Sequence, residues 1–209
     1  MKAIIIANGT YLKKELFNKI YDKKDFIICA DGGLNYIDNL NIIPNLIVGD
    51  FDSVNKDILH KYNNVETVKY KPEKDYTDTE LAIEKAIEFG FKEILLVCAT
   101  GTRLDHTMAN VLLIEKYIKE TISIRLIDNN NYIQPLVQNK TINICKNCFV
   151  SIIPLTDYIQ IDSLEGFKYP LLDRTVNRGS TLCISNEIVS ETAEIKISHG
   201  IGLLIISND

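Results

Sequence analysis

The first 128 residues alternate short apolar runs with segments of helical periodicity. The apolar runs are rich in Ile, Leu and Val with little in-out alternation, which is typical of strands covered on both faces. They lie at residues 2–7, 25–30, 45–50, 93–98 and 123–128. The segments between them with the spacing of amphipathic helices lie at residues 10–21, 54–62, 77–90 and 105–120. This repetition predicts an α/β fold, a doubly wound parallel sheet with helices on both faces.

The third of these helices is the best defined in the pattern. Thr77 and Glu80 have the spacing of a capping box, in which each side chain bonds the backbone of the other. An apolar stripe covers residues 82–87, and Gly90 is typical of a helix end. The sequence therefore predicts a helix that begins just after Thr77.

The pattern changes after residue 128. Residues 129–140 form a polar break with a proline, which is either a linker or a first strand. Short alternating or β-branched segments follow at residues 140–145, 148–155, 157–164, 181–185, 193–198 and 202–207. They predict a small antiparallel β-sandwich domain. We place the boundary near residues 129–136, with an α/β domain at residues 1–130 and a β-sandwich domain at residues 131–209.

Charge and hydropathy narrow the classes of partner. The net charge of −5 argues against nucleic acid as the main partner, because phosphate backbones select basic surfaces. No apolar stretch reaches the roughly 18–20 residues that span a bilayer, and the apolar run near the N-terminus is too short for a signal peptide. We expect a cytoplasmic protein without a membrane partner.

Polar residues gather where the predicted parallel strands end. In an open parallel sheet, ligands bind outside the carboxyl ends of the strands. The segments that follow the apolar runs are Asn8-Gly9, Asp31-Gly32-Gly33, residues 49–53, residues 74–78 and residues 100–106. Three of them carry paired or flanked carboxylates, so we predict that acidic groups converge at one edge of the sheet.

Asp50 and Asp52 are the most informative pair at this edge. Their separation matches the period of an extended strand, which aims both side chains the same way. Magnesium is usually held by one or two carboxylates together with substrate phosphates. The alternative interpretation is a solvated acidic turn in which one of the two caps a helix.

The next two loops add groups suited to phosphate. Asp75 and Asp78 lie at a helix start, where acidic residues complement the dipole and where free N–H groups also bind phosphate. Residues 100–102 can wrap a phosphate with backbone N–H groups. Arg103 then either neutralises that phosphate or forms an ion pair with Asp105. No GxxxxGK[ST] motif is present, so the chain is not a P-loop kinase.

Five motifs taken together resemble those of a known family. They are "ADGGLN", "GDFDSV", "KDYTDTELA", "ATGTRLDHTMAN" and "RGSTLCISNE". In this order they resemble the thiamine pyrophosphokinases (thiamine diphosphokinases) of the bacterial type, over essentially the whole chain. The resemblance implies a nucleotide-binding α/β domain followed by a thiamine-binding β-sandwich. It also implies a Mg²⁺-dependent transfer of a diphosphoryl group from ATP to the hydroxyl of thiamine, giving thiamine diphosphate and AMP, by a homodimer with active sites between the subunits.

The resemblance also implies roles for individual residues. Asp50, Asp52 and Asp78 match magnesium ligands, and Asp75 and Asp105 match further acidic positions around the reacting groups. The ATP side is matched by Asp31, Gly32, Gly33, Thr77, Thr100, Gly101, Arg103, His106 and Asn110. Ser185 and Asn186 match the segment that holds the aminopyrimidine of thiamine.

The sequence leaves three questions open: the aromatic cover of the pyrimidine, the proton acceptor and two alternative functions. Some family members cover the pyrimidine with a tryptophan, which this chain lacks, and Tyr158, Phe167 and Tyr169 are the alternatives. The proton acceptor is either Asp78 or Asp105. Two other functions are compatible with the loops alone: a magnesium-dependent phosphohydrolase and a non-catalytic module that binds thiamine or a nucleotide.

Overall fold

The computed structural model describes residues 1–71, 73, 75–118, 121–143 and 147–208. Contacts within the chain divide it into two compact units, Met1–Asn129 and Asn130–Asp209. Each unit has its own architecture.

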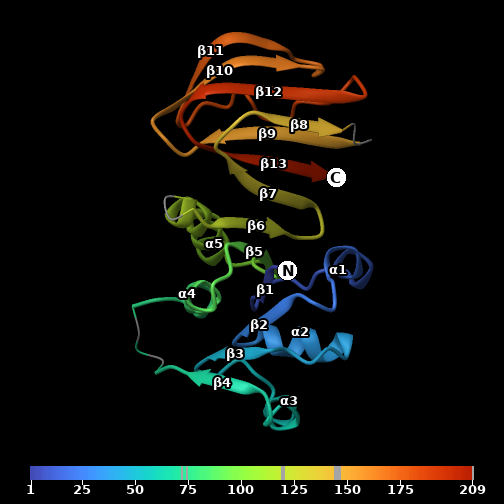
Figure 1. The fold of residues 1–209 in the computed structure, drawn as a ribbon, viewed down its shortest axis with the longest axis vertical. Helices are drawn as coiled ribbons and strands as arrows, with labels where there is room; N and C mark the ends of the chain where they lie inside the picture. The colour runs from blue at the N-terminus through green and yellow to red at the C-terminus, as the bar shows by residue number, and fades with distance from the viewer. Residues whose placement is uncertain (72, 74, 119–120, 144–146, 209) are drawn as a thin grey trace. The chain divides into compact units, whose positions relative to one another are not determined.

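The first unit is built on a parallel sheet. Its strands lie in the order β4-β3-β2-β1-β5-β6, and each described pair of neighbours is parallel (Figure 1). The strands are β1 (Ala3–Ile6), β2 (Phe26–Ala30), β3 (Leu46–Gly49), β4 (Glu66–Lys69), β5 (Glu93–Val97) and β6 (Ser123–Ile127). Because β1 and β5 are adjacent while β2 follows β1 on the other side, the strand order reverses between them, where ligand crevices form in such sheets.

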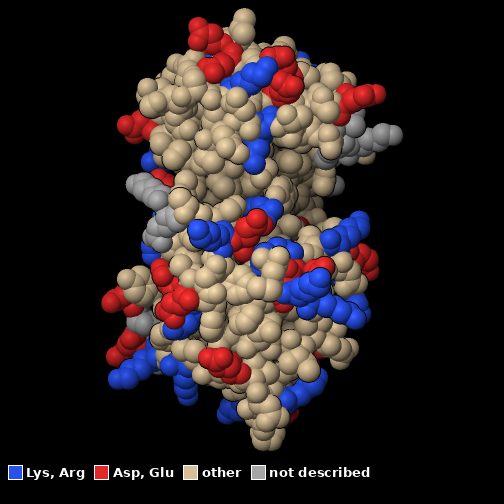
Figure 2. Space-filling view, viewed as in Figure 1, with Lys and Arg blue, Asp and Glu red and all other residues tan. Residues whose placement is uncertain are grey.

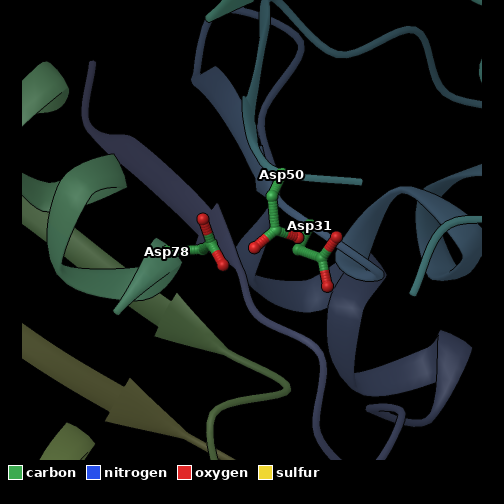
Figure 3. Close-up of side chains that lie close together, drawn as sticks. All are labelled: Asp31, Asp50 and Asp78. Atoms are coloured by element: carbon green, nitrogen blue, oxygen red, sulfur yellow. The ribbon is translucent and has the colours of Figure 1, made fainter. Parts of the chain in front are cut away.

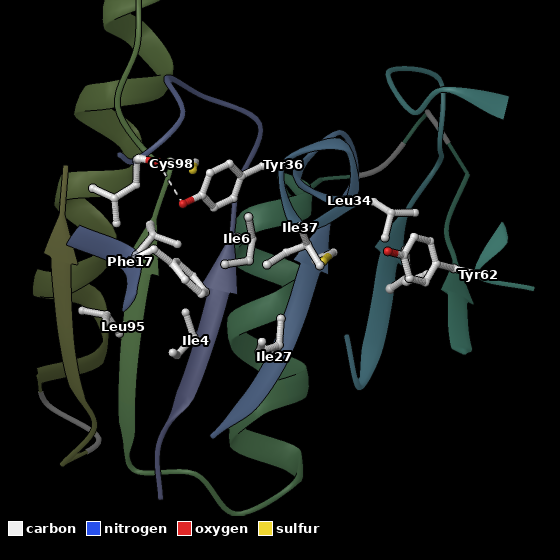
Figure 4. Packing of buried hydrophobic residues seen from close by; sticks show 14 of the residues in the cluster. Ile4, Ile6, Phe17, Ile27, Leu34, Tyr36, Ile37, Tyr62, Leu95 and Cys98 are labelled. Carbon is white, nitrogen blue, oxygen red and sulfur yellow. Dashed lines mark hydrogen bonds between the residues drawn. The ribbon is translucent and has the colours of Figure 1, made fainter. Parts of the chain in front are cut away.

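Helices cover both faces of this sheet. They are α1 (Lys14–Ile20), α2 (Gly33–Leu40), α3 (Lys56–Lys61), α4 (Asp78–Glu88) and α5 (Leu104–Ile118). On one face, Ile4 and Ile6 of β1 pack in one buried cluster with Phe17 of α1 and Ile37 of α2 (Figure 4). On the other face α4 contacts β1, β2 and β3, and α5 contacts β6. The predicted doubly wound α/β architecture is confirmed.

The helix α2 was not predicted from the sequence, whereas the start of α4 was. The Thr77 hydroxyl accepts the Glu80 N–H at 3.3 Å, as the capping pattern predicts. The helix α2 has only eight residues and begins at a glycine, which has low helix propensity. A Cβ on Gly33 would lie 2.1 Å from the carbonyl oxygen of Ile6, so the glycine is required for α2 to pack against β1.

The second unit is an antiparallel β-sandwich. Its strands are β7 (Asn131–Leu136), β8 (Lys140–Asn143), β9 (Cys148–Pro154), β10 (Tyr158–Glu165), β11 (Leu171–Asn177), β12 (Thr192–His199) and β13 (Gly202–Asn208). The strand β13 pairs with β7 and β9, and a second sheet has the order β11-β10-β12-β8. Buried side chains from both sheets, such as Ile152, Ile161 and Leu204, form one core. The predicted sandwich is confirmed.

The structure differs from two predictions for the second unit, and the ends of two predicted segments cannot be compared with it. Residues 181–185, predicted as a strand, form turns. The strand β11 was missed because it lies at a sheet edge and is mostly polar and exposed, which removes the alternating signal. The ends of two predicted segments, residues 119–120 and 144–145, lie outside the described residues.

Surface features agree with an ordinary globular chain. None of the described helices is long and apolar enough to cross a membrane. On the face drawn in Figure 2, basic and acidic side chains are interspersed rather than separated by sign. A local gathering of carboxylates therefore needs a local explanation.

Asp25 provides a stability prediction at the amino ends of the strands. Its carboxylate accepts hydrogen bonds from the backbone N–H of Lys2 at 3.1 Å and of Asp22 at 2.9 Å, and from Lys2 Nζ at 2.5 Å. Burial raises the pKa of Asp25, but these bonds outweigh burial and hold its pKa below the ordinary value. The ionised carboxylate therefore stabilises the folded chain.

We expect Asp25→Ala to lower the free energy of unfolding by about 2 kcal/mol at pH 7, because charge-assisted bonds are lost. A carboxylate whose pKa is lower in the folded chain stabilises the folded state at pH values above its unfolded pKa of about 3.9. This stabilisation is lost as the pH falls through the folded-state pKa. The difference from the wild type, measured by urea unfolding, should therefore narrow at pH 3. Asp22→Ala at an exposed neighbour is the control, and an equal loss at both pH values would contradict the prediction.

Candidate active site

The loops at the carboxyl edge of the first unit enclose a cavity of about 560 Å³. The loops after β1, β2 and β5 and the first turns of α4 and α5 contribute to its walls. Eight residues expected from the sequence line it: Asp31, Thr77, Asp78, Thr100, Gly101, Arg103, His106 and Asn110. The cavity therefore lies at the edge where the sequence predicts ligand binding.

Three carboxylates meet at this edge. Asp31 follows β2, Asp50 follows β3, and Asp78 is the first residue of α4. One oxygen from each lies within 4.8 Å of the others (Figure 3). The expected metal set of Asp50, Asp52 and Asp78 is thus represented here by two members, with Asp31 as the third. Asp52 is exposed, and its carboxylate accepts the Ser53 hydroxyl at 2.9 Å.

Backbone geometry brings Asp31 and Asp50 together. Gly49, at the end of β3, has φ 153°, and a Cβ there would lie 3.2 Å from the Cα of Asp31. Asp31 itself has φ 46°, in the left-handed region, while its N–H donates to the Val48 carbonyl at 2.8 Å. These two departures from extended backbone turn the strand ends toward each other.

The electrostatics of Asp31 fit a cation ligand. Burial raises the pKa of Asp31, and the nearby charges of Asp78 and Asp52 raise it further against hydrogen bonds from Ser53 and Gly32. Its Oδ1 atom is buried and has no hydrogen-bond partner among the described residues. A buried polar oxygen without a partner is costly, and a cation would supply one. Because all three donors are carboxylate oxygens, the cluster fits a hard divalent ion such as Mg²⁺.

The loop between β5 and α5 is held by side chains rather than by regular structure. Buried Asn110 donates from Nδ2 to the Ala99 carbonyl at 2.8 Å. The Gly101 N–H donates to the Thr107 hydroxyl at 3.1 Å, and the Thr100 hydroxyl donates to Asp128 at 3.0 Å. In this arrangement the Gly101 N–H is engaged by Thr107, so Thr107 competes with any phosphate for that donor.

Arg103 forms the ion pair that was one of its two expected roles. Its Nη2 lies 2.6 Å from Asp105 Oδ2, and its Nε donates to Oδ1 at 3.3 Å. This hydrogen-bonded pairing raises the pKa of Arg103 and lowers the pKa of Asp105. Both side chains are about two-thirds exposed, 69% and 65%, and exposed pairs are worth little, so Arg103 remains available to an incoming phosphate.

Some residues expected at the site do not line the cavity, and some lining residues were not expected. The described residues that were expected at the site but do not line this cavity are Gly32, Gly33, Asp50, Asp52, Asp75 and Asp105. Of these, Asp50 still belongs to the carboxylate cluster beside the cavity. Thr10, Thr79 and Thr107 line the cavity without having been expected there, and Asn8, Gly9 and Ser53 line it from segments that were expected at this edge without an individual role. Asn8 and Gly9 follow the first strand at the same edge, and that position was the available signal.

The second unit holds the remaining expected residues. Both ends of the Asn186 carboxamide bind the backbone of Tyr169: Oδ1 accepts its N–H at 3.0 Å and Nδ2 donates to its carbonyl at 2.8 Å. Ser185 is exposed, with φ 57°. Of the three aromatic alternatives, Phe167 is buried in the core and Tyr158 stacks on His199, whereas Tyr169 is 59% exposed. Asn186 therefore fixes the backbone that presents the Tyr169 ring.

Comparison with known families assigns the two units. The family model "Thiamin pyrophosphokinase, catalytic domain" matches residues 17–126, and "Thiamin pyrophosphokinase, vitamin B1 binding domain" matches residues 138–203. The chain belongs to the thiamine pyrophosphokinase family. The three carboxylates and the cavity residues from Ala30 onward lie in the catalytic match, whereas residues 7–10 of the cavity wall precede it. Tyr169 and Asn186 lie in the vitamin B1 binding match.

Individual family members are similar along most of their length. Thiamine pyrophosphokinase of Bacillus subtilis is 35% identical over 192 residues, which cover 90% of each chain. The crystal structure of the Bacillus subtilis enzyme superposes with a TM-score of 0.90 at 31% identity, covering 100% of both chains. That of Geobacillus thermodenitrificans thiamin pyrophosphokinase gives 0.87 at 31% identity, covering 100% of this chain and 98% of the other.

Proposed function

We propose that this protein is an ATP-dependent thiamine diphosphokinase. It transfers a diphosphoryl group from ATP to the hydroxyl of thiamine in a Mg²⁺-dependent reaction and releases thiamine diphosphate and AMP. The observation that carries the proposal is the cluster of Asp31, Asp50 and Asp78, which lies beside a cavity and within the segment that the family's catalytic domain matches. The match of the second unit to a vitamin B1 binding domain supports thiamine as the acceptor.

The carboxylates of Asp31, Asp50 and Asp78 would hold the metal, with Asp52 as a further acidic group close enough to raise the pKa of Asp31. Bound Mg²⁺ would neutralise phosphate oxygens and stabilise the charge that develops on them. Without a cation the acidic edge would repel a polyphosphate, so ATP binding and metal binding are expected to depend on each other.

The remaining cavity residues position the phosphates. Arg103 contributes charge, residues 100–102 contribute backbone donors, and the first turns of α4 and α5 line the same space. Phosphoryl transfer depends mainly on such positioning and on electrostatic stabilisation. Thr77, His106 and Asn110 line this side of the cavity. Gly32 and Gly33 lie next to the cavity residue Asp31, and Asp75 adds charge near α4.

The proton of the thiamine hydroxyl must be accepted during attack on the β-phosphorus. Asp105 is disfavoured because it does not line the cavity within the described chain. Asp78 lines the cavity, and we assign it as the acceptor. AMP leaves in line with the incoming oxygen.

We assign the binding of thiamine to the second unit, which matches a vitamin B1 binding domain. We assign its aminopyrimidine to the segment of Ser185 and Asn186 and to the exposed ring of Tyr169, whose flat face suits stacking. A homodimer with active sites between subunits, in the cytoplasm, is part of the proposal and rests on the family resemblance.

The function is tested by incubating the protein with ATP, MgCl₂ and thiamine and separating the products by chromatography. We expect AMP and thiamine diphosphate in equal amounts. Omitting thiamine is the control: a phosphohydrolase would still consume ATP, and a binding module would show thermal stabilisation without product. Either result would contradict the proposed activity.

The metal ligands are tested by isosteric variants of single carboxylates. We expect Asp31→Asn, Asp50→Asn and Asp78→Asn each to lower turnover about a hundredfold or more at fixed MgCl₂, because each removes a ligand charge. Thiamine binding, followed by calorimetry, should be largely retained. Asp52→Asn serves as the matched comparison: a loss as large as that of Asp31→Asn would return Asp52 to the metal set and contradict the ligand set assigned here.

Tyr169 is tested as the aromatic cover of the pyrimidine. We expect Tyr169→Ala to raise the KM for thiamine about tenfold, because stacking and buried area are lost, while the KM for ATP is unchanged. Tyr158→Ala removes another partly exposed ring that stacks on His199 and is the matched control. Equal KM values for thiamine in the two variants would show that Tyr169 does not cover the ring.

A further inference from the structure

Two polar residues at the end of β6, Asp128 and Asn129, hold the cavity loops in place. The Asp128 carboxylate accepts the hydroxyl of Thr100, in the loop between β5 and α5, at 3.0 Å. The Asn129 carboxamide binds the loop between β1 and α1 at two points. Its Oδ1 accepts the Lys13 N–H at 2.8 Å, and its Nδ2 donates to the Tyr11 carbonyl at 3.0 Å.

These two loops form adjoining walls of the cavity. Gly9 and Thr10 line it from the first loop, and Thr100 lines it from the second. The loops are also bonded directly to each other, because the Gly9 N–H donates to the Cys98 carbonyl and the Thr10 N–H to the Thr100 carbonyl, both at 2.7 Å. A shift of one loop is therefore transmitted to the other.

The first loop is fixed from two sides around Leu12. Leu12 is 3% exposed, and its carbonyl accepts the buried Tyr36 hydroxyl at 2.9 Å, which anchors the loop to the core. Asn129 binds the residues on either side of Leu12 from outside the core. The position demands a side chain with one donor and one acceptor in a planar fork, which a carboxamide provides and a carboxylate or an aliphatic group does not.

We propose that Asn129 and Asp128 are positioning residues for phosphate transfer: they set the spacing between the two loops that receive the nucleotide phosphates. They act through Thr100, Tyr11 and Lys13, and neither residue lines the cavity in the described structure. Because the spacing of these loops fixes where phosphate donors point, its loss reduces turnover more than the binding of thiamine. This inference rests on the proposed function.

The test compares Asn129→Ala with Asn45→Ala. Asn45 also uses its Oδ1 to accept a backbone N–H, that of Ile27 at 2.8 Å, but it lies at the opposite edge of the same sheet. We expect Asn129→Ala to lower kcat/KM for ATP about ten- to a hundredfold, the scale of small misplacements at a reacting centre, with the KM for thiamine unchanged. Asn45→Ala should retain wild-type kinetics with a similar change in Tm.

Amide exchange and a conservative variant at Asp128 complete the test. Hydrogen exchange at the Lys13 amide should be faster in Asn129→Ala than in Asn45→Ala, because its acceptor is gone. Asp128→Asn retains an acceptor for Thr100 and should keep more activity than Asp128→Ala. Wild-type kinetics in Asn129→Ala, or equal losses in the two Asp128 variants, would overturn the inference. Absence of AMP formation by the wild type would instead refute the proposed function, and exchange at Lys13 would still report on the loop.

Discussion

The mutual repulsion of three carboxylates is the constraint around which the edge of the first unit is organised. Ionised groups at the spacing of Asp31, Asp50 and Asp78 repel one another by on the order of a few kcal/mol per pair at the effective dielectric of a protein surface. The fold nevertheless brings them together, and it leaves one buried oxygen of Asp31 without a hydrogen bond in the described chain. Such an arrangement lowers stability unless a cation binds, which makes it an indicator of function rather than of folding.

The topology of the fold brings the three carboxylates to one edge, and local backbone geometry directs their side chains toward one another. Parallel pairing places the ends of β2 and β3 side by side, and the N-terminus of α4 brings Asp78 to the same edge. Pairing alone does not set the direction of a side chain beyond the last paired residue. That direction comes from the left-handed backbone of Asp31 and from the missing side chain of Gly49, which allows the two strand ends to approach.

This difference explains how far the sequence could be interpreted. The strands from β1 to β6 other than β4 are visible in the sequence because burial on both faces makes them nearly continuous apolar runs. The helix α4 is visible because burial of one face imposes the helical period on its side chains. The edge that carries the ligand follows from the topology of the fold. The choice between Asp31 and Asp52 as the third member of the cluster does not, because a period of two in an extended strand favours Asp52, and Phe51, with φ 68°, interrupts that period. The helix α2 was not predicted because it begins at a glycine, which has low helix propensity. The strand β11 was not predicted because it is mostly exposed at a sheet edge.

Some polar residues at the edge of the first unit hold the walls of the cavity, and two of them, Asn110 and Thr107, also line it. The loop between β5 and α5 is hydrogen-bonded by the side chains of Asn110, Thr107 and Asp128. The loop between β1 and α1 is hydrogen-bonded by the side chain of Asn129. Loops lack the ladders that fix helices and strands, so their precision must come from such side chains. We expect removal of one of these side chains to leave the fold and its core in place and to make the cavity loops less well fixed. The site therefore depends on side-chain hydrogen bonds that the scaffold beneath it does not need.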